Sequence, residues 1–292
     1  MSHGSIAWAA ALALVVVSTA GCHNARQDPP PPAAYEHLRV GEQYLTQNHP
    51  DKAVPEIEIA QTIAPNSFTV KLALGRAYSA MGWLDRAVST YNQAGELDPK
   101  SPEPLNQIGR IYMAKGLFPE AEDDFDQALK KNDKFVDAHF NKGLLYYEFM
   151  KRTDDAKQEL DKALALDPNH ADAHVELGKI DLENGLWDGA RAHFEAALTI
   201  KPAHVNARYN LGLDYLEQKR YERAIDEFKK TIALDPRLVP AHNNLGYAYR
   251  QIGRPESARA EYKRTLEIDP DNQLARDALR EISQEKPKGL TD

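Results

Sequence analysis

The sequence contains a single cysteine, Cys22, among its 292 residues. A disulfide within the chain needs two cysteines, so no disulfide framework can stabilise this fold. The usual signatures of enzyme and cofactor sites are also missing: there is no H-E-x-x-H, no Walker loop, no G-x-S-x-G and no zinc-type cysteine pair. We therefore expect no catalytic residues, no metal and no cofactor.

Basic residues are too few for a nucleic-acid-binding protein. The chain has 36 Lys and Arg against 44 Asp and Glu, a formal net charge of −8. Proteins that bind nucleic acid present a basic stripe or patch, because phosphate contacts provide most of the affinity. The acidic balance argues against nucleic acid as the main partner.

Long apolar runs are also scarce. The one candidate is Ile6 to Ala20, which carries no charge and is too short for a membrane-spanning helix of about 20 residues. Its length suits the apolar region of a signal peptide. The run ends in Thr-Ala-Gly-Cys at positions 19–22.

This ending resembles the lipobox of bacterial lipoproteins. The resemblance implies that residues 1–21 are a signal peptide, that cleavage precedes Cys22, and that lipid is attached to Cys22. It further implies anchoring in the cell envelope. His23 follows the cysteine where that family's inner-membrane retention signal is aspartate, which favours the periplasmic face of the outer membrane. A plain secretory signal and an uncleaved anchor are the alternatives.

A proline-rich stretch follows. Residues 27–34 read Q-D-P-P-P-P-A-A. Consecutive prolines favour an extended polyproline segment that resists packing. We expect residues 22–34 to be an acylated cysteine followed by a tether.

The rest of the chain is organised by a period of 34 residues. Glycines recur in one register at Gly41, Gly75, Gly109, Gly143, Gly178, Gly212 and Gly246. Alanines recur with the same period at Ala53, Ala87, Ala121, Ala156, Ala190, Ala224 and Ala258. A large apolar residue follows each alanine by four positions, and prolines close most units. Each unit contains two amphipathic helical patterns separated by a turn, so each predicts a helix hairpin.

These columns resemble the tetratricopeptide repeat (TPR). The resemblance covers seven repeats in residues 35–272 and implies an all-α, right-handed superhelical solenoid. A further amphipathic pattern, with Leu274, Ala275, Ala278, Leu279 and Ile282 on one face, predicts a capping helix and tail in residues 273–292.

A few positions depart from the repeat. Asp181 stands where tyrosine is expected, and Asp133 replaces the closing proline of the third repeat. One extra residue lies between Gly143 and Ala156. Pro55 falls within the first turns of a predicted helix, where we expect it to delay the helix start.

The histidines are the only candidates for chemistry. His139, His174 and His242 occupy the fourth repeat position, where the family often has a packing residue, so we interpret them as structural. His170 and His174, with Asp172 between them, form at most a partial metal site. No third ligand is indicated, and we predict no metal.

The resemblance also implies a concave groove lined by the first helix of each hairpin. From the fourth repeat onward, the corresponding positions are mostly apolar or aromatic, which predicts a strip that binds a protein or peptide. The predicted groove residues are Phe140, Leu144, Tyr147, Val175, Leu182, Tyr209, Leu213, Leu216 and Tyr247. The alternative is that the strip packs against neighbouring helices or a second copy of the chain.

A clamp for a C-terminal carboxylate is not favoured. Asn106, Arg110 and Asn141 are the nearest match to the clamp of some TPR proteins. The following repeat offers Asp172 and Glu176 where cations are required, and these acids would repel a carboxylate.

We therefore predict a membrane-anchored TPR protein that mediates protein–protein interactions in the assembly of a cell-envelope complex. The combination of lipobox, tether and TPRs is similar to the type IV pilus pilotin family, which implies a secretin as the client. Two alternatives remain open: an accessory subunit of an envelope enzyme, such as a murein hydrolase or a polysaccharide-export machine, and a small-solute or glycan binder.

Overall fold

The computed structural model describes residues 29–284. The predicted signal peptide, Cys22, most of the tether and the final tail lie outside the described residues. Within 29–284 every regular element is helical, as predicted. No helix in this range is long and apolar enough to cross a membrane.

The helices divide into two compact units, residues 1–150 and 151–292. The described part of the first unit contains α1 (Pro32–Thr46), α2 (Pro50–Ile63), α3 (Phe68–Ala80), α4 (Leu84–Leu97), α5 (Glu103–Ala114), α6 (Phe118–Lys131), α7 (Val136–Leu144) and the π-helix η1 (Leu145–Phe149). That of the second contains α8 (Thr153–Leu166), α9 (Ala171–Glu183), α10 (Trp187–Ile200), α11 (Val205–Glu217), α12 (Tyr221–Leu234), α13 (Val239–Gln251), α14 (Pro255–Ile268) and α15 (Gln273–Gln284).

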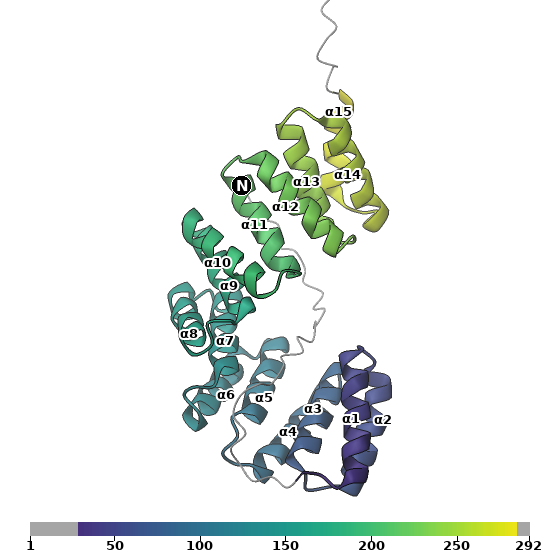
Figure 1. The fold of residues 1–292 in the computed structure, drawn as a ribbon, viewed down its shortest axis with the longest axis vertical. Coiled ribbons are helices and arrows are strands. Elements are labelled where there is room, and N and C mark those ends of the chain that lie inside the picture. Colours follow the sequence, from purple (N-terminus) through teal and green to yellow (C-terminus); the bar gives the residue numbers. More distant parts are fainter. Residues whose placement is uncertain (1–28, 285–292) are drawn as a thin grey trace, which may run out of the picture. The chain divides into compact units, whose positions relative to one another are not determined.

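Within each unit, a helix packs mainly against the helices that precede and follow it in the chain (Figure 1). In the first unit the pairs α1/α2, α3/α4 and α5/α6 are hairpins, and in the second the pairs α9/α10, α11/α12 and α13/α14 are hairpins. α15 packs on α14 and covers it with Ala275, Ala278 and Ile282, as the amphipathic pattern predicts. Packing between sequence neighbours is the hallmark of a solenoid.

The close approach of the two helices explains the glycine column. A Cβ placed on Gly75 would lie 2.5 Å from Cε1 of Tyr91, inside contact distance. The same relation joins the other pairs Gly41–Ile57, Gly109–Phe125, Gly178–Phe194, Gly212–Phe228 and Gly246–Tyr262. The alanines of the second column are all fully buried. Glycine therefore gives each hairpin room for one large side chain against the backbone of the facing helix.

Two departures from the repeat have a structural explanation. The extra residue of the fourth repeat lies in the stretch that contains η1, where a π-helical turn accommodates one more residue than an α-helical turn. The missing proline at Asp133 does not abolish the turn, because Asn132 Oδ1 accepts a hydrogen bond of 3.0 Å from the backbone amide of Lys134. Asp98 makes the corresponding bond to Lys100 in the repeat before it.

The expectation for Pro55 was wrong. α2 begins at Pro50 and continues through Pro55 without a break. A proline at this point removes one helical hydrogen bond, to the carbonyl four residues earlier in the first turn. Ala53, Val54 and Ile57 are buried in a hydrophobic cluster of the first unit, and this burial outweighs the lost hydrogen bond.

Substituting Gly75 tests the close approach. Gly75→Ala should lower the free energy of unfolding by about 1–3 kcal/mol, because the new methyl group overpacks against the buried ring of Tyr91. Gly95 in α4 is the matched control, since its Cβ would meet nothing closer than Pro104 at 3.8 Å. Gly95→Ala should be neutral or stabilise by up to about 1 kcal/mol. Equal effects of the two substitutions in urea unfolding would contradict the packing argument.

Candidate functional site

The predicted groove residues of the first unit do not share one environment. Phe140 and Leu144 on α7 are half-buried. Tyr147 is buried, with 6% of its surface exposed, and lies within η1. The π-helical turn shifts residues relative to an α-helical register, so a groove position assigned by counting along an α-helix need not face the groove.

The predicted groove residues of the second unit also differ in exposure. Val175 on α9 is buried at 2%, and it belongs to a cluster with Ala197 and Ala207. Four of the predicted groove residues are partly buried and pack against the hydrophobic cluster formed around Phe228 and Leu245. These four are Leu182, Tyr209, Leu213 and Leu216. Tyr247 on α13 is the exception, since 45% of its surface is exposed.

Tyr209 is held in place rather than free to meet a ligand. Its hydroxyl accepts a hydrogen bond of 2.9 Å from Nδ2 of Asn244, and its ring lies 5.8 Å from that of Phe228. Burial raises the pKa of Tyr209 to about 12. The phenol is therefore neutral at physiological pH and connects α11 to α13.

Tyr247 lies on the same helix as one end of an ion pair, and the predicted groove positions of the preceding first helix are apolar. Arg250, three residues later on α13, pairs with Glu281 of the capping helix at 2.8 Å. Leu213 and Leu216 on the preceding first helix keep part of their surface accessible. In the second unit, the groove prediction is thus reduced to Tyr247 and these half-buried leucines, and their role in binding a partner stays a prediction.

The carboxylate clamp finds no support in the side-chain pairing. Asn141 Nδ2 donates to Asn106 Oδ1 at 2.9 Å, and both amides are buried. In the second unit Asp172 pairs with His204, and Glu176 pairs with Lys179. The asparagines are engaged with each other, and the acids of the second unit are paired with His204 and Lys179.

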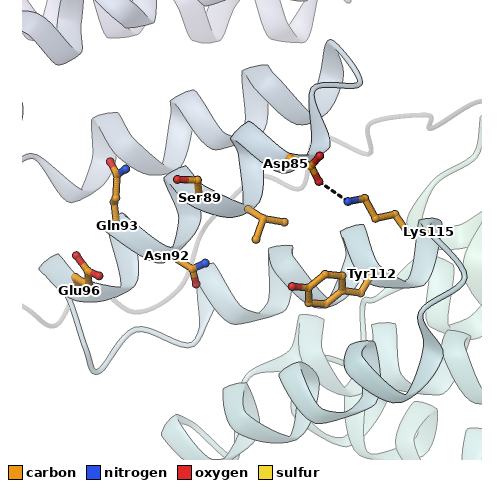
Figure 2. A pocket seen from close by; sticks show the side chains of 8 residues that line it. Asp85, Ser89, Asn92, Gln93, Glu96, Tyr112 and Lys115 are labelled. Carbon is orange, nitrogen blue, oxygen red and sulfur yellow. Dashed lines mark hydrogen bonds and ion pairs between the residues drawn. The ribbon is translucent and has the colours of Figure 1, made fainter.

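Sequence reasoning missed a polar hollow of about 580 Å³ between α4 and α5 in the first unit (Figure 2). Polar side chains of α4 line one side, and Tyr112 of α5 and Lys115, the residue that caps α5, line the other. Lys115 Nζ pairs with Asp85 Oδ1 at 2.6 Å. Small-molecule sites are mostly apolar with a few polar groups, so this lining does not match a cofactor pocket.

The fourth repeat position forms a recurrent polar contact within the hairpin. A basic side chain there reaches the second helix 19 residues later. These contacts are His37–Glu56 at 2.7 Å, His174–His193 at 3.1 Å, Arg208–Glu227 at 3.0 Å and His242–Glu261 at 2.7 Å. In the second unit this side chain also bonds the backbone carbonyl six residues earlier, namely Pro168, Pro202 and Pro236 for His174, Arg208 and His242. The structural interpretation of His174 and His242 agrees with these contacts, and His139 makes the same backward bond to Asp133.

The third hairpin lacks this contact. Its fourth position is Leu105, which is apolar, and the acid at the facing position is Asp124. Asp124 Oδ2 is buried without a hydrogen-bond partner. Burial, with a smaller contribution from Asp123, raises the pKa of Asp124 from 3.8 to about 6.

Asp124 should make stability depend on pH. The folded protein binds this proton more readily than the unfolded chain, so stability should rise as pH falls from about 6 to about 4. Asp124→Asn should stabilise the protein at pH 7.5 and remove this component. Glu261→Leu, which deprives His242 of its hydrogen-bond partner, is the control and should destabilise. Thermal unfolding of the unsubstituted protein and of both variants between pH 4 and 8 measures these effects. A lower melting temperature of Asp124→Asn at pH 7.5 would contradict the argument.

The partial metal site considered from the sequence is not assembled. His170 Nδ1 accepts a hydrogen bond from the backbone amide of Ala173, and Asp172 bonds His204 Nε2 at 3.0 Å. Within residues 29–284 no three His, Cys, Asp or Glu side chains form a metal-binding group. His174 contacts His193 instead. His193 lies 19 residues later on the next helix, and the sequence spacing of the histidines did not indicate this contact.

Comparison with known families identifies the repeats. Sequence models described as tetratricopeptide repeat match residues 106–149, 150–209 and 209–273, and a further model described as TPR repeat matches residues 75–116. The chain belongs to the tetratricopeptide-repeat family. The TPR fold is typically a scaffold for protein–protein interaction. A comparison with curated protein sequences gives no match.

Solved TPR structures share the fold at low sequence identity. Cut9 in the APC/C hetero-tetramer Cut9–Hcn1 superposes with a TM-score of 0.69 at 17% identity over 85% of this chain and 52% of its own. The chain thus spans about half the length of that protein. PilF of Pseudomonas aeruginosa gives a TM-score of 0.66 at 17% identity, over 73% of this chain and 97% of its own. YrrB, a TPR protein with an unusual peptide-binding site, gives a TM-score of 0.53 at 20% identity, over 66% of this chain and 99% of its own. At these identities the likeness concerns the fold.

Proposed function

We propose that this TPR protein is anchored in the cell envelope by a lipid on Cys22 and assembles a multiprotein complex there. The anchor rests on the sequence pattern of the first 22 residues. The assembly function rests on the family and on the absence of catalytic signatures in the sequence. The type IV pilus secretin is the specific client that we favour, because the predicted architecture resembles pilotins and PilF shares the fold.

The exposure of Tyr247 is the observation on which the proposed partner surface rests. It is a large aromatic side chain, 45% exposed, on the first helix of the last hairpin. Arg250, three residues later on the same helix, pairs with Glu281, and the predicted groove leucines of the preceding first helix, Leu213 and Leu216, are half-buried. Exposed aromatic residues with an apolar surround and a charged rim are typical anchors of protein interfaces. We propose that a peptide or helix of the partner binds over Tyr247.

A photo-crosslinking amino acid at position 247 tests this surface. Crosslinking in intact cells should yield one discrete adduct, and Tyr247→Glu should lower partner recovery in pull-downs by about tenfold or more, as expected for an interface hot spot. Trp187, the first residue of α10 and 37% exposed, is the matched control position. Equal crosslinking at both positions, or unchanged recovery with Tyr247→Glu, would overturn the assignment. A secretin, a hydrolase or an export protein in the adduct distinguishes the candidate clients.

Substituting Cys22 tests the anchor separately. Cys22→Ala should move the full-length protein from the membrane fraction to the soluble fraction, or leave it with an uncleaved signal, because stable anchoring depends on attached acyl chains. Mass spectrometry of the N-terminal peptide should show acylated Cys22 in the unsubstituted protein. Membrane retention of Cys22→Ala with a normally processed N-terminus would contradict lipid anchoring.

A further inference from the structure

The fifth hairpin contains a side-chain contact of a different kind from its neighbours. In two other hairpins of the second unit, the nitrogen-bearing side chain at the fourth position meets an acid: Arg208 meets Glu227, and His242 meets Glu261. In the fifth hairpin, His174 of α9 meets His193 of α10. Their Nδ1 atoms are 3.1 Å apart, and their ring centroids are 5.4 Å apart.

The outer nitrogen of His174 lies within hydrogen-bond distance of an acceptor, and that of His193 lies at ion-pair distance from a carboxylate. His174 Nε2 lies 3.2 Å from the carbonyl oxygen of Pro168, which can only accept a hydrogen bond, so this nitrogen carries the proton. His193 Nε2 lies 3.9 Å from Asp181 Oδ2, and the carboxylate favours a proton on that nitrogen. With the protons on both outer nitrogens, the two Nδ1 lone pairs face each other at 3.1 Å, an arrangement that a cation between them stabilises.

Either one ring turns its Nδ1–H toward the lone pair of the other, or a cation lies between the two nitrogens. Neutral imidazole nitrogens are the form that binds metal ions. The short separation of the two Nδ1 atoms, on facing helices and in a half-buried place, is the observation that carries a metal site.

We propose that His174 and His193 chelate one divalent late transition-metal ion, of the zinc, copper or nickel type, through their Nδ1 atoms. Imidazole nitrogens bind these ions at about 2.0–2.1 Å. Two nitrogens 3.1 Å apart can both reach one ion at that distance, with an angle at the metal of roughly 100°. This angle lies between those of square-planar and tetrahedral coordination.

The outer nitrogens complete the pattern of a metal-binding histidine pair. Metal-binding histidines commonly donate their second ring N–H to a carbonyl or a carboxylate, which fixes the tautomer and orients the ring. The carbonyl of Pro168 occupies this place for His174, and the carboxylate of Asp181 lies 3.9 Å from the outer nitrogen of His193. Asp181 is itself held by Lys157 Nζ at 3.3 Å and is 5% exposed. Asp181, which replaces the tyrosine of the repeat, is thus the positioning residue for His193.

The two rings leave room for further ligands. Both histidines are half-buried, and His193 exposes 27% of its side chain. No third protein side chain completes a metal-binding group within residues 29–284. Water or a ligand from a bound partner would fill the other coordination positions.

Zinc titration of the full chain tests the proposal. Competition with a chromophoric chelator at pH 7.5 should show one more equivalent of bound zinc in the unsubstituted protein than in His174→Gln/His193→Gln. A second variant, His174→Arg/His193→Glu, introduces the residue pair of the sixth hairpin and should fold normally without binding this equivalent. The matched control is His37→Gln/His242→Gln, which also removes two histidines but should retain the zinc.

Two further readouts separate a site from general affinity for zinc. Asp181→Asn should weaken zinc binding by about 10–100-fold, as expected when the orienting partner of a ligand is lost. Binding should also weaken from pH 7.5 to pH 6, because the metal competes with protons for the rings. Zinc binding that is absent, or that falls equally in the His37/His242 control, would overturn the proposal, and the pair would then share a proton.

Discussion

The contact between a glycine backbone and one large side chain underlies the rest of this structure. In each hairpin where the contact is described, the ring or aliphatic side chain lies so close to the glycine that a Cβ would collide with it. This close approach lets two short helices bury a continuous apolar face between them. Since each hairpin then packs on its sequence neighbours, stability is built from local contacts, and side chains outside these columns can vary without loss of the fold.

That organisation explains why the fold could be predicted from the sequence. The glycine, alanine and large apolar columns recur with one period, and each column has a steric reason. Pro55 was misjudged because the expectation considered only the helical hydrogen bond and not the burial of its neighbours Val54 and Ile57. The form taken by the extra residue of the fourth repeat was not predictable, because an insertion can form a bulge, a longer loop or a π-helical turn such as η1.

The candidate groove was only partly predictable, for a related reason. A repeat position gives the direction of a side chain but not how much of it the adjacent hairpins cover. Val175 and Tyr247 were both assigned to the groove, yet α10 and α11 contribute the alanines that pack on Val175, whereas Tyr247 remains exposed. Exposure depends on the size of the facing side chains, and the repeat pattern does not contain that information. The hollow beside Tyr112 was missed because it lies between a second helix and the following first helix, outside the expected groove.

The polar contact at the fourth position shows how a repeat can carry chemistry without losing its structure. A hairpin tolerates several pairs there: Arg208–Glu227 forms an ion pair, whereas Leu105 leaves Asp124 unpaired and shifts its pKa. His174–His193 has the same place in the fold as these pairs, but its two nitrogens can share a cation. His174 alone looked like a packing residue because its partner is 19 residues away on another helix. In a repeat protein, a residue's function is therefore better judged from the residue it faces than from its own column.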